Sequence, residues 1–462
     1  MHYDTGRAAL SAPAIDDLLA ARVRDGRTPS VAYALVADGR LVHAGGFADE
    51  AVTPVPDADT AFRIASCTKS FTAVAMLQQR DAGRLDLDAP VTDYLPLTTV
   101  PAAAPTVAQL ASMAAGFPTD DPWGDRQESL ALEDFDRMAA AGFRLVDAPG
   151  TRFEYSNLGY ALLGRVIERA SGRRYLDLVR EDVLTPLGLS GIAYDRDVAA
   201  PGGIATGFAR FGGRWAPQPF AGPGAFSPIG GIFATPRSLA AWVAWLADAW
   251  RPDASDGVLS AASRREAQTA HIRIEGPGSY GYGLFLDEHP RHGLLVSHSG
   301  GYPGYGAHMR WHAATGLGVV VLENARYSGA GVPAAKALEL LLDQVGSPET
   351  VPDVWPETLA ARETVERLLR RWDEPAADAL FAENIVLDES IERRRATIEA
   401  LSARAGLAAD APVLPLEQAA PASRSAAHLA WTVRGVRGAL RVEIRLTPER
   451  HPTVQTLSVR LG

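Results

Sequence analysis

Cysteine and lysine are the residue types that this 462-residue sequence most clearly lacks. Its single cysteine, Cys67, excludes disulfides within the chain and favours a reducing compartment. Of its 45 basic residues, only Lys69 and Lys336 are lysine. Arginine therefore serves wherever a positive charge is enough. A lysine that is kept points to a need for an amine that can lose its proton.

Long apolar runs, a basic surface and an N-terminal export signal are also missing. No apolar stretch approaches the ~18 residues that a membrane span requires. The net charge of −10 argues against a nucleic-acid partner. The residues after Met1 show no basic head followed by an apolar run, so we expect a cytoplasmic protein without a membrane partner. With 47% hydrophobic residues and this length, two globular domains are expected.

The first domain is predicted to span residues 1–347. A helix is expected over 14–24, followed by strands over 30–36 and 40–46 that Asp38-Gly39 joins in a hairpin. A long helix-rich stretch follows, with helices predicted over 71–84, 158–171 and 238–250. Strands are then predicted over 280–286, 293–297, 306–311 and 317–322, and a helix over 332–345. This order predicts an α/β (α+β) architecture: an antiparallel sheet built from both ends of the domain, with an inserted helical subdomain.

A second, smaller domain is predicted after a Pro-rich linker at 348–357. Helices are expected over 358–372 and 391–405, and strands over 427–433, 440–447 and 453–460. This pattern predicts a small α+β domain over 358–462, of NTF2-like or lipocalin-like form. We expect it to cover the cleft, to mediate a homodimer or to stabilise the first domain.

The first candidate for chemistry is Ser66-Cys67-Thr68-Lys69, which precedes a helical apolar pattern. At the spacing i, i+3 the serine hydroxyl and the lysine amine lie on one helical face. Serine is a weak nucleophile until a base removes its proton, and a lysine with a lowered pKa can act as that base. The alternative is an N-cap serine followed by a solvated lysine, and the motif alone leaves both open.

The second candidate is Tyr155-Ser156-Asn157, before a predicted helix. A phenol held near an ammonium can exist as phenolate and act as a general base. Asn157 can orient the lysine and hydrogen-bond a substrate amide. The alternative is an N-cap asparagine beside a packed tyrosine.

The third candidate is His298-Ser299-Gly300-Gly301, expected at the end of an apolar strand. Glycines there let a substrate backbone approach the strand closely. The backbone N–H groups of Ser66 and Gly301 are candidates for an oxyanion hole. Considered alone, His298 fits an ordinary strand-end histidine.

Together, the three elements resemble the ordered Ser-x-x-Lys, Tyr-x-Asn and Lys/His-Thr/Ser-Gly motifs of the β-lactamase-related serine hydrolases. That group includes penicillin-binding proteins, class C β-lactamases, D-alanyl-D-alanine carboxypeptidases, D-aminopeptidases and family VIII-like esterases. The flanking segments 62–65, 149–160 and 229–235 are similar as well. The resemblance covers about residues 10–345 and implies the serine β-lactamase/transpeptidase-like fold.

The resemblance also implies roles for individual residues. Ser66 would be the acylated nucleophile, Lys69 its proton acceptor or relay, and Tyr155 the general base in acylation and proton donor to the leaving group. The backbone N–H groups of Ser66 and Gly301 would hold the oxyanion. No metal or cofactor is implied, and the partner is a small-molecule or peptide substrate. The substrate-binding residues would be Asn157, His298, Ser299 and Gly300.

One departure narrows the expected activity. Class C β-lactamases usually carry lysine where this chain has His298, so we expect weak or no β-lactamase activity. The first hypothesis is a hydrolase of amide, peptide or ester bonds, with D-residue or broad specificity. A penicillin-binding-type thioesterase that cyclises or releases nonribosomal peptides is the second. The third is a non-catalytic penicillin-binding scaffold.

An acidic segment lies between the first two motifs. Asp120, Asp121, Trp123 and Asp125 are expected on a loop over the cleft. They would either favour cationic substrates or form a solvated acidic loop with Trp123 packed beneath it.

Overall fold

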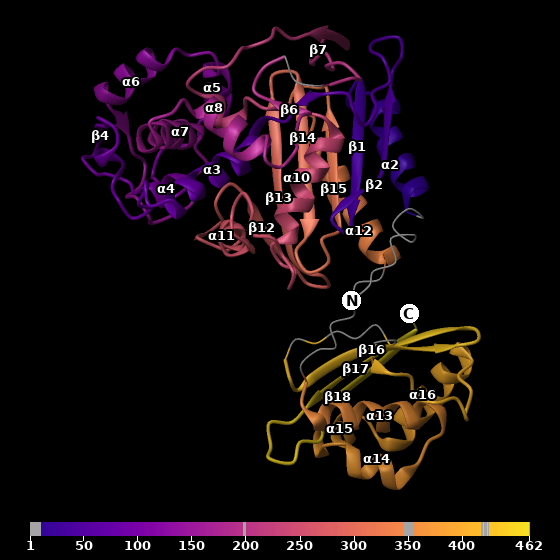
Figure 1. Cartoon of the computed structure of the whole chain (residues 1–462). Coiled ribbons are helices and arrows are strands. Elements are labelled where there is room, and N and C mark those ends of the chain that lie inside the picture. The colour runs from indigo at the N-terminus through magenta and orange to yellow at the C-terminus, as the bar shows by residue number, and fades with distance from the viewer. Residues whose placement is uncertain are drawn as a thin grey trace. The chain divides into compact units, whose positions relative to one another are not determined.

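A computed structural model describes residues 11–196, 200–345, 354–416, 419, 423 and 425–461 (Figure 1). The chain divides into two compact units, Met1–Val345 and Gly346–Gly462. None of the described helices is long and apolar enough to cross a membrane.

The first unit is built on an eight-stranded antiparallel sheet (Figure 1). The strand order is β10-β11-β12-β13-β14-β15-β1-β2, so strands from both ends of the unit lie side by side, as the sequence predicts. The first two strands form the expected hairpin, with Asp38 and Gly39 both at positive φ. The strands are β1 (Ser30–Ala37), β2 (Arg40–Ala48), β10 (Ile272–Arg273), β11 (Gly278–Tyr280), β12 (Phe285–His289), β13 (Gly293–Tyr302), β14 (Tyr305–His312) and β15 (Gly318–Glu323).

Helices cover both faces of this sheet. Every residue of β1 is buried, because alternate side chains pack against different helices. Val31 and Leu35 share a core with α2 (Ala12–Arg24) and α12 (Gly331–Val345). Ala32 and Ala34 instead belong to the core that contains Trp242 of α10 (Pro236–Asp248). From the sequence, the helix over 238–250 was grouped with the helix-rich stretch. In the structure, this helix is α10, and it packs on the sheet.

The inserted helical subdomain lies between β2 and α10. Its main core helices are α3 (Lys69–Asp81) and α7 (Asn157–Ser171), which pack against each other. Its other helices and turns are η1 (Ala65–Thr68), η2 (Val91–Asp93), α4 (Val107–Ala111), α5 (Asp121–Gly124), η3 (Asp125–Gln127), α6 (Leu132–Ala141), α8 (Tyr175–Leu178), η4 (Val179–Leu184) and α9 (Ser227–Gly230). Its short strands are β3 (Phe62–Arg63), β4 (Thr99–Val100), β5 (Phe143–Arg144), β6 (Ile192–Ala193), β7 (Phe208–Phe211), β8 (Arg214–Pro217) and β9 (Phe233–Ala234), and α11 (Ala261–Ala267) follows α10. These strands pair in the orders β3-β9-β6, β4-β5 and β7-β8.

Two sequence predictions in this unit are wrong in detail. The strand expected over 280–286 is two strands, because β11 ends at Tyr280 and β12 begins at Phe285. Gly283 makes the turn between them at φ +72°, and a Cβ there would come within 2.6 Å of the Lys69 carbonyl oxygen. The turn therefore packs against the first turn of α3. His298 lies inside β13 and not at its end, because the strand continues to Tyr302.

The described residues of the second unit form four α-helices followed by three strands. Its strands form an antiparallel meander, β16 (His428–Gly435), β17 (Gly438–Leu446) and β18 (Val454–Leu461). The helices are α13 (Pro356–Arg370), α14 (Glu374–Leu380), α15 (Glu383–Asp388) and α16 (Ile391–Ala405). The core includes Leu368 of α13 and Trp431 of β16. Three described strands in an open sheet do not form the closed barrel of a lipocalin-like module, whereas the NTF2-like form stays a prediction.

The linker prediction overlaps this unit. Helix α13 begins at Pro356, inside the linker expected over 348–357, because proline suits the first turn of a helix. Residues 346–353 lie outside the described residues. The sequence also missed α14 and α15, which are only seven and six residues long.

Candidate active site

Ser66 lies in a short 3-10 turn that leads directly into α3. The turn, η1, spans Ala65–Thr68, and α3 begins at Lys69. Ala65 has φ 48°, a conformation that residues other than glycine rarely adopt. The turn is held against β13 by the Cys67 thiol, whose Sγ donates to the His298 carbonyl oxygen at 3.2 Å. The nucleophile candidate is therefore fixed between a helix and a strand.

Lys69 is fully buried and hydrogen-bonded on all sides. Its Nζ lies 2.9 Å from Ser66 Oγ, 2.7 Å from Asn157 Oδ1 and 3.0 Å from the Ile229 carbonyl oxygen. These three acceptors match the three protons of an ammonium. Burial lowers the pKa of Lys69 to about 8, although Asp121, Asp125 and Asp120 oppose that change. The amine can therefore exchange a proton near neutral pH.

Tyr155 lies beside the same pair of residues. The Lys69 Nζ lies 5.0 Å from the centroid of the Tyr155 ring, and the phenol interacts with the Ser66 hydroxyl. Burial raises the pKa of Tyr155 well above its usual value, and the carboxylate of Asp121 adds to that rise. The sequence indicated that a phenol near an ammonium can exist as phenolate. Burial acts in the opposite direction and favours the protonated phenol.

Asn157 is the first residue of α7 and is fully buried. Its Oδ1 faces Lys69, and its Nδ2 donates to Asp121 Oδ1 at 2.9 Å. The start of α7 is capped twice. Ser156 Oγ accepts from the Gly159 N–H, and the Asp120 carboxylate accepts from the N–H groups of Asn157 and Leu158 at 2.7 and 2.8 Å. The helix end therefore fixes where the Asn157 side chain points.

The opposite side of the site is formed by β13. Strand β12 pairs with β13 only as far as Ser297, so His298 and the residues after it have no strand partner on that edge among the described residues. The η1 turn packs there instead. A Cβ on Gly300 would lie 2.2 Å from the Ile64 carbonyl oxygen, so this close approach requires glycine.

His298 is uncharged at neutral pH. It is 1% exposed, and burial lowers its pKa to about 3, with a smaller contribution from Lys69. Both ring nitrogens have partners: Nε2 lies 3.1 Å from Tyr280 Oη, and Nδ1 lies 2.6 Å from the Ser299 carbonyl oxygen. The Ser299 side chain is bonded to His308 Nδ1 at 2.8 Å. This strand therefore presents no cation to a substrate.

Gly301 lies against Tyr327, which follows β15. A Cβ on Gly301 would come within 2.5 Å of the Tyr327 ring. Tyr327 has φ 46°, and its hydroxyl donates to Asp125 Oδ2 at 2.7 Å. Asp125 belongs to η3 of the inserted subdomain. This hydrogen bond thus joins the inserted subdomain to the segment after β15, next to Gly301.

The acidic segment does not form the solvated loop that the sequence offered as one expectation, and the preference for cationic substrates stays a prediction. Asp125 is buried and bonded to Tyr327, and Asp120 caps α7, so the segment is not a solvated loop. Trp123 is 42% exposed and packs edge-on against Phe226, so it does not lie buried beneath the loop. Of the three carboxylates in this segment, only Asp121 is both exposed and in contact with the side chain of a candidate site residue.

Two contributors to the site were not predicted to contact the site residues. One is the Ile229 carbonyl oxygen, a backbone group whose identity no side-chain pattern reveals. The other is Asp121, which was noted only for its charge. The segment 229–235 was recognised as similar to a family block, and that similarity was the one available signal for Ile229.

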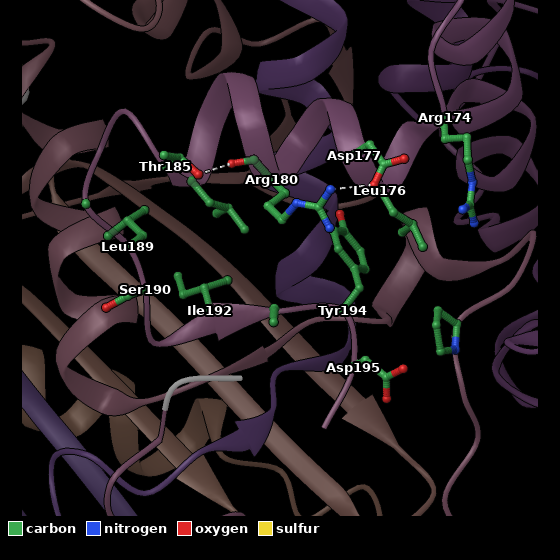
Figure 2. Close-up of a pocket in the computed structure, with 14 residues that line it drawn as sticks. Arg174, Leu176, Asp177, Arg180, Thr185, Leu189, Ser190, Ile192, Tyr194 and Asp195 are labelled. Atoms are coloured by element: carbon green, nitrogen blue, oxygen red, sulfur yellow. Dashed lines mark hydrogen bonds and ion pairs between the residues drawn. The ribbon is translucent and has the colours of Figure 1, made fainter. Parts of the chain in front are cut away.

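A separate cavity of about 560 Å³ lies along α8, η4 and the segment that follows (Figure 2). Leu176, Leu189 and Ile192 give it an apolar surface, and Arg180 pairs with Asp177 at its edge. None of the predicted site residues lines this cavity. Among the described residues, no group of three or more His, Cys, Asp or Glu is placed to hold a metal ion.

The sheet, the inserted helices and the Ser66–Lys69 turn together define the β-lactamase/transpeptidase-like fold. Residues 15–344 match the family described as Beta-lactamase, and the chain belongs to that family. The chain is 30% identical over 253 residues to Beta-lactamase-like protein 2 of Dictyostelium discoideum, a match that covers 50% of this chain. The matched part is 43% of that relative, so the chain spans less than half of its length.

Two solved structures have the same fold. The octameric penicillin-binding protein homologue from Pyrococcus abyssi aligns with a TM-score of 0.65 and 21% identity, covering 96% of this chain and 100% of that one. A D-stereospecific amidohydrolase from Streptomyces sp. aligns with a TM-score of 0.60 and 23% identity, covering 70% of this chain and 97% of that one. The fold predicted from the sequence is confirmed.

Proposed function

We propose that the protein is a serine hydrolase that cleaves an amide, peptide or ester bond through an acyl-enzyme on Ser66. The supporting observation is the 2.9 Å contact between Lys69 Nζ and Ser66 Oγ in a buried site. An amine whose pKa is lowered to about 8 is a base of suitable strength near neutral pH. Its position is fixed by two other acceptors, Asn157 Oδ1 and the Ile229 carbonyl oxygen.

Acylation begins with the neutral amine of Lys69. Two of its positions are occupied by N–H groups that donate to Asn157 and Ile229, so its lone pair points at Ser66 Oγ. Lys69 takes the hydroxyl proton as Oγ bonds to the substrate carbonyl carbon. The resulting oxyanion accepts from the backbone N–H groups of Ser66 and Gly301.

Tyr155 then acts as an acid. Because its pKa is raised by burial, the phenol holds a proton that it can give to the leaving nitrogen or oxygen as the scissile bond breaks. The ammonium of Lys69 returns a proton to Tyr155. In deacylation, water bonds to the acyl carbon and gives a proton to Lys69. The bond between that carbon and Oγ then breaks, Lys69 returns the proton to Oγ, and the carboxylic acid leaves. This assigns the base role to Lys69 and the acid role to Tyr155.

The lack of a cation on β13 affects which substrates we expect the site to bind. His298 is neutral and fully bonded, so β13 offers no cation for the carboxylate of a β-lactam. We therefore expect D-amino-acid amides, peptides or simple esters to be better substrates than penicillins. The similarity to a D-stereospecific amidohydrolase from Streptomyces sp. is consistent with the amide arm of this proposal.

The test is intact-mass analysis of the purified protein with four probes: a p-nitrophenyl ester, a D-alanyl peptide amide, a penicillin and a peptidyl thioester. We expect the ester or amide to acylate the wild type and to turn over at a rate that Ser66→Ala lowers by at least about a thousandfold. Ser129→Ala, at an exposed serine of the inserted subdomain, is the control and should keep wild-type turnover. Preferred turnover of the thioester would favour the thioesterase alternative. Labelling by none of the four would favour a scaffold.

A further inference from the structure

Asp121 touches the candidate site from the side of Asn157 that faces away from Lys69. Its Oδ1 accepts from Asn157 Nδ2 at 2.9 Å, while Asn157 Oδ1 accepts from Lys69 Nζ at 2.7 Å. Lys69 Nζ in turn lies 2.9 Å from Ser66 Oγ. The four side chains form one hydrogen-bonded series that begins at an exposed carboxylate and ends at the nucleophile.

The Asn157 amide has two orientations of nearly equal shape. One presents oxygen to Lys69 and nitrogen to Asp121, and the other reverses the two groups. An ionised carboxylate accepts hydrogen bonds and cannot donate them, so only the first orientation satisfies both neighbours. We propose that Asp121 is a positioning residue, which locks the Asn157 amide so that its oxygen holds Lys69 beside Ser66. This inference rests on the proposed function, because it concerns the machinery of that reaction.

The positioning of the Asn157 amide by Asp121 matters most when Lys69 has lost its proton. An ammonium can only donate, so it alone would keep the amide oxygen turned toward it. A neutral amine also has a lone pair and would accept from a reversed amide, which would occupy the electron pair that must take the Ser66 proton. With Asp121 present, reversal would place the buried amide oxygen against a carboxylate oxygen, which is unfavourable. Asp121 thus keeps the lone pair free for Ser66.

The carboxylate also acts on Lys69 through its charge. Asp121 opposes the effect of burial on the pKa of Lys69, as do Asp125 and Asp120. Removing the Asp121 charge therefore lowers the pKa of Lys69 further, and the catalytic amine becomes neutral at lower pH. The other titratable groups that face Lys69 are Cys67 of η1, Glu128 directly after η3, Tyr155, Tyr160 of α7 and His298 of β13.

The chain permits a direct measurement, because it contains only two lysines. Labelling with ¹³C-lysine gives one signal for Lys69 and one for Lys336, which is exposed and paired with Glu339. In Asp121→Asn the titration midpoint of Lys69 should fall by about one pH unit, while that of Lys336 stays unchanged. Asp134→Asn, at a partly exposed residue of α6 that pairs with Arg137, is the matched control and should move neither signal.

Kinetics test the positioning itself. We expect Asp121→Asn to lower kcat by about tenfold, with a smaller change in KM, and to move the acid limb of the pH profile to lower pH. Asp121→Glu keeps the charge and the acceptor and should recover part of kcat. In an Asn157→Ala background, Asp121→Asn should change kcat less than about twofold, because its effect passes through Asn157.

The outcomes separate this inference from the proposed function. An unchanged Lys69 midpoint in Asp121→Asn overturns the role of Asp121, whether or not the protein is a hydrolase. Additive effects of Asp121→Asn and Asn157→Ala on kcat also overturn it. A shifted midpoint in a protein that no probe acylates supports the electrostatic contact of Asp121 with the Lys69–Asn157 pair and contradicts the hydrolase proposal, because the titration needs no turnover.

Discussion

The two sides of the candidate site differ in their charge and in what determines their shape. The insertion wall (Asp120, Asp121, Asp125, Tyr155 and Asn157) carries carboxylates whose positions are set by side-chain hydrogen bonds. The sheet wall (His298, Gly300 and Gly301) carries no charge at neutral pH and is shaped by backbone and by missing Cβ atoms. Substitutions on the insertion wall should therefore change how activity and stability depend on pH. Substitutions on the sheet wall should change the position of the turn that carries Ser66.

The strongest test of this contrast is Gly300→Ala on the sheet wall. The new Cβ would meet the Ile64 carbonyl oxygen at 2.2 Å, so the turn that carries Ser66 must move. We expect kcat/KM with a p-nitrophenyl ester to fall by about a hundredfold, since small displacements of reacting groups have effects of that size. Gly278→Ala in β11 is the control, because its Cβ would meet nothing closer than 3.5 Å. Equal losses in both variants would contradict the geometric role.

A smaller kinetic effect is expected at the neutral histidine. His298→Gln should lower kcat/KM by no more than about tenfold and should leave the shape of the pH profile between about 5 and 8 unchanged. The reason is that burial lowers the pKa of His298 to about 3, so the side chain does not change charge in that range. The measurement is kcat/KM against pH for both proteins. Loss of a limb near the usual histidine pKa of about 6.5 in the variant would show that His298 titrates there after all.

The next effect is on stability, at the cap of the insertion wall. Asp120→Ala leaves the N–H groups of Asn157 and Leu158 without their carboxylate acceptor. We expect the free energy of unfolding to fall by about 1 kcal/mol, with a loss of activity because Asn157 begins that helix. Asp373→Ala removes the cap of α14 in the second unit and is the matched control. It should lower stability without lowering kcat, and a similar kcat loss in both variants would contradict the interpretation.

The most subtle effect concerns how stability varies with pH. Burial raises the pKa of Asp125 to about 7, from its usual value of 3.8. Between these values the folded protein holds a proton that the unfolded chain has released, so wild-type stability falls as the pH rises through that window. In Asp125→Asn this decline should be smaller. Urea midpoints at about pH 4.5 and about pH 7.5 measure it, and an identical change in both proteins would exclude Asp125 as the cause.

Local patterns predicted most of the framework. The helix expected over 391–405 is observed as Ile391–Ala405, and the β1–β2 hairpin forms at Asp38-Gly39. Both depend on residues close in sequence. The split of the strand expected over 280–286 depends instead on how Gly283 meets the Lys69 carbonyl, a contact between segments far apart in the chain. Periodicity holds no information about such a contact.

For the candidate site too, the sequence predicted some features and not others. The motifs named Ser66 and Asn157, two of the three residues that accept from Lys69, and Tyr155 beside it, because motif order reflects a shared fold. Their protonation did not follow from sequence. The sequence allowed Tyr155 to exist as phenolate beside an ammonium, whereas burial raises the pKa of Tyr155, and burial is a property of the assembled molecule. The partner of Asn157 was equally hidden, since nothing in Asp120-Asp121 shows which carboxylate caps a helix and which contacts an amide.

Cys67 can report on the opening of the contact between the Ser66 turn and β13. Its thiol is fully buried between the Ser66 turn and β13, and burial raises its pKa to about 12, so thiol reagents in solution have no thiolate to attack them. Alkylation can proceed only while the turn is lifted from the strand. Because the sequence contains no other cysteine, the rate of thiol trapping measures how often the native protein opens the contact between the Ser66 turn and β13.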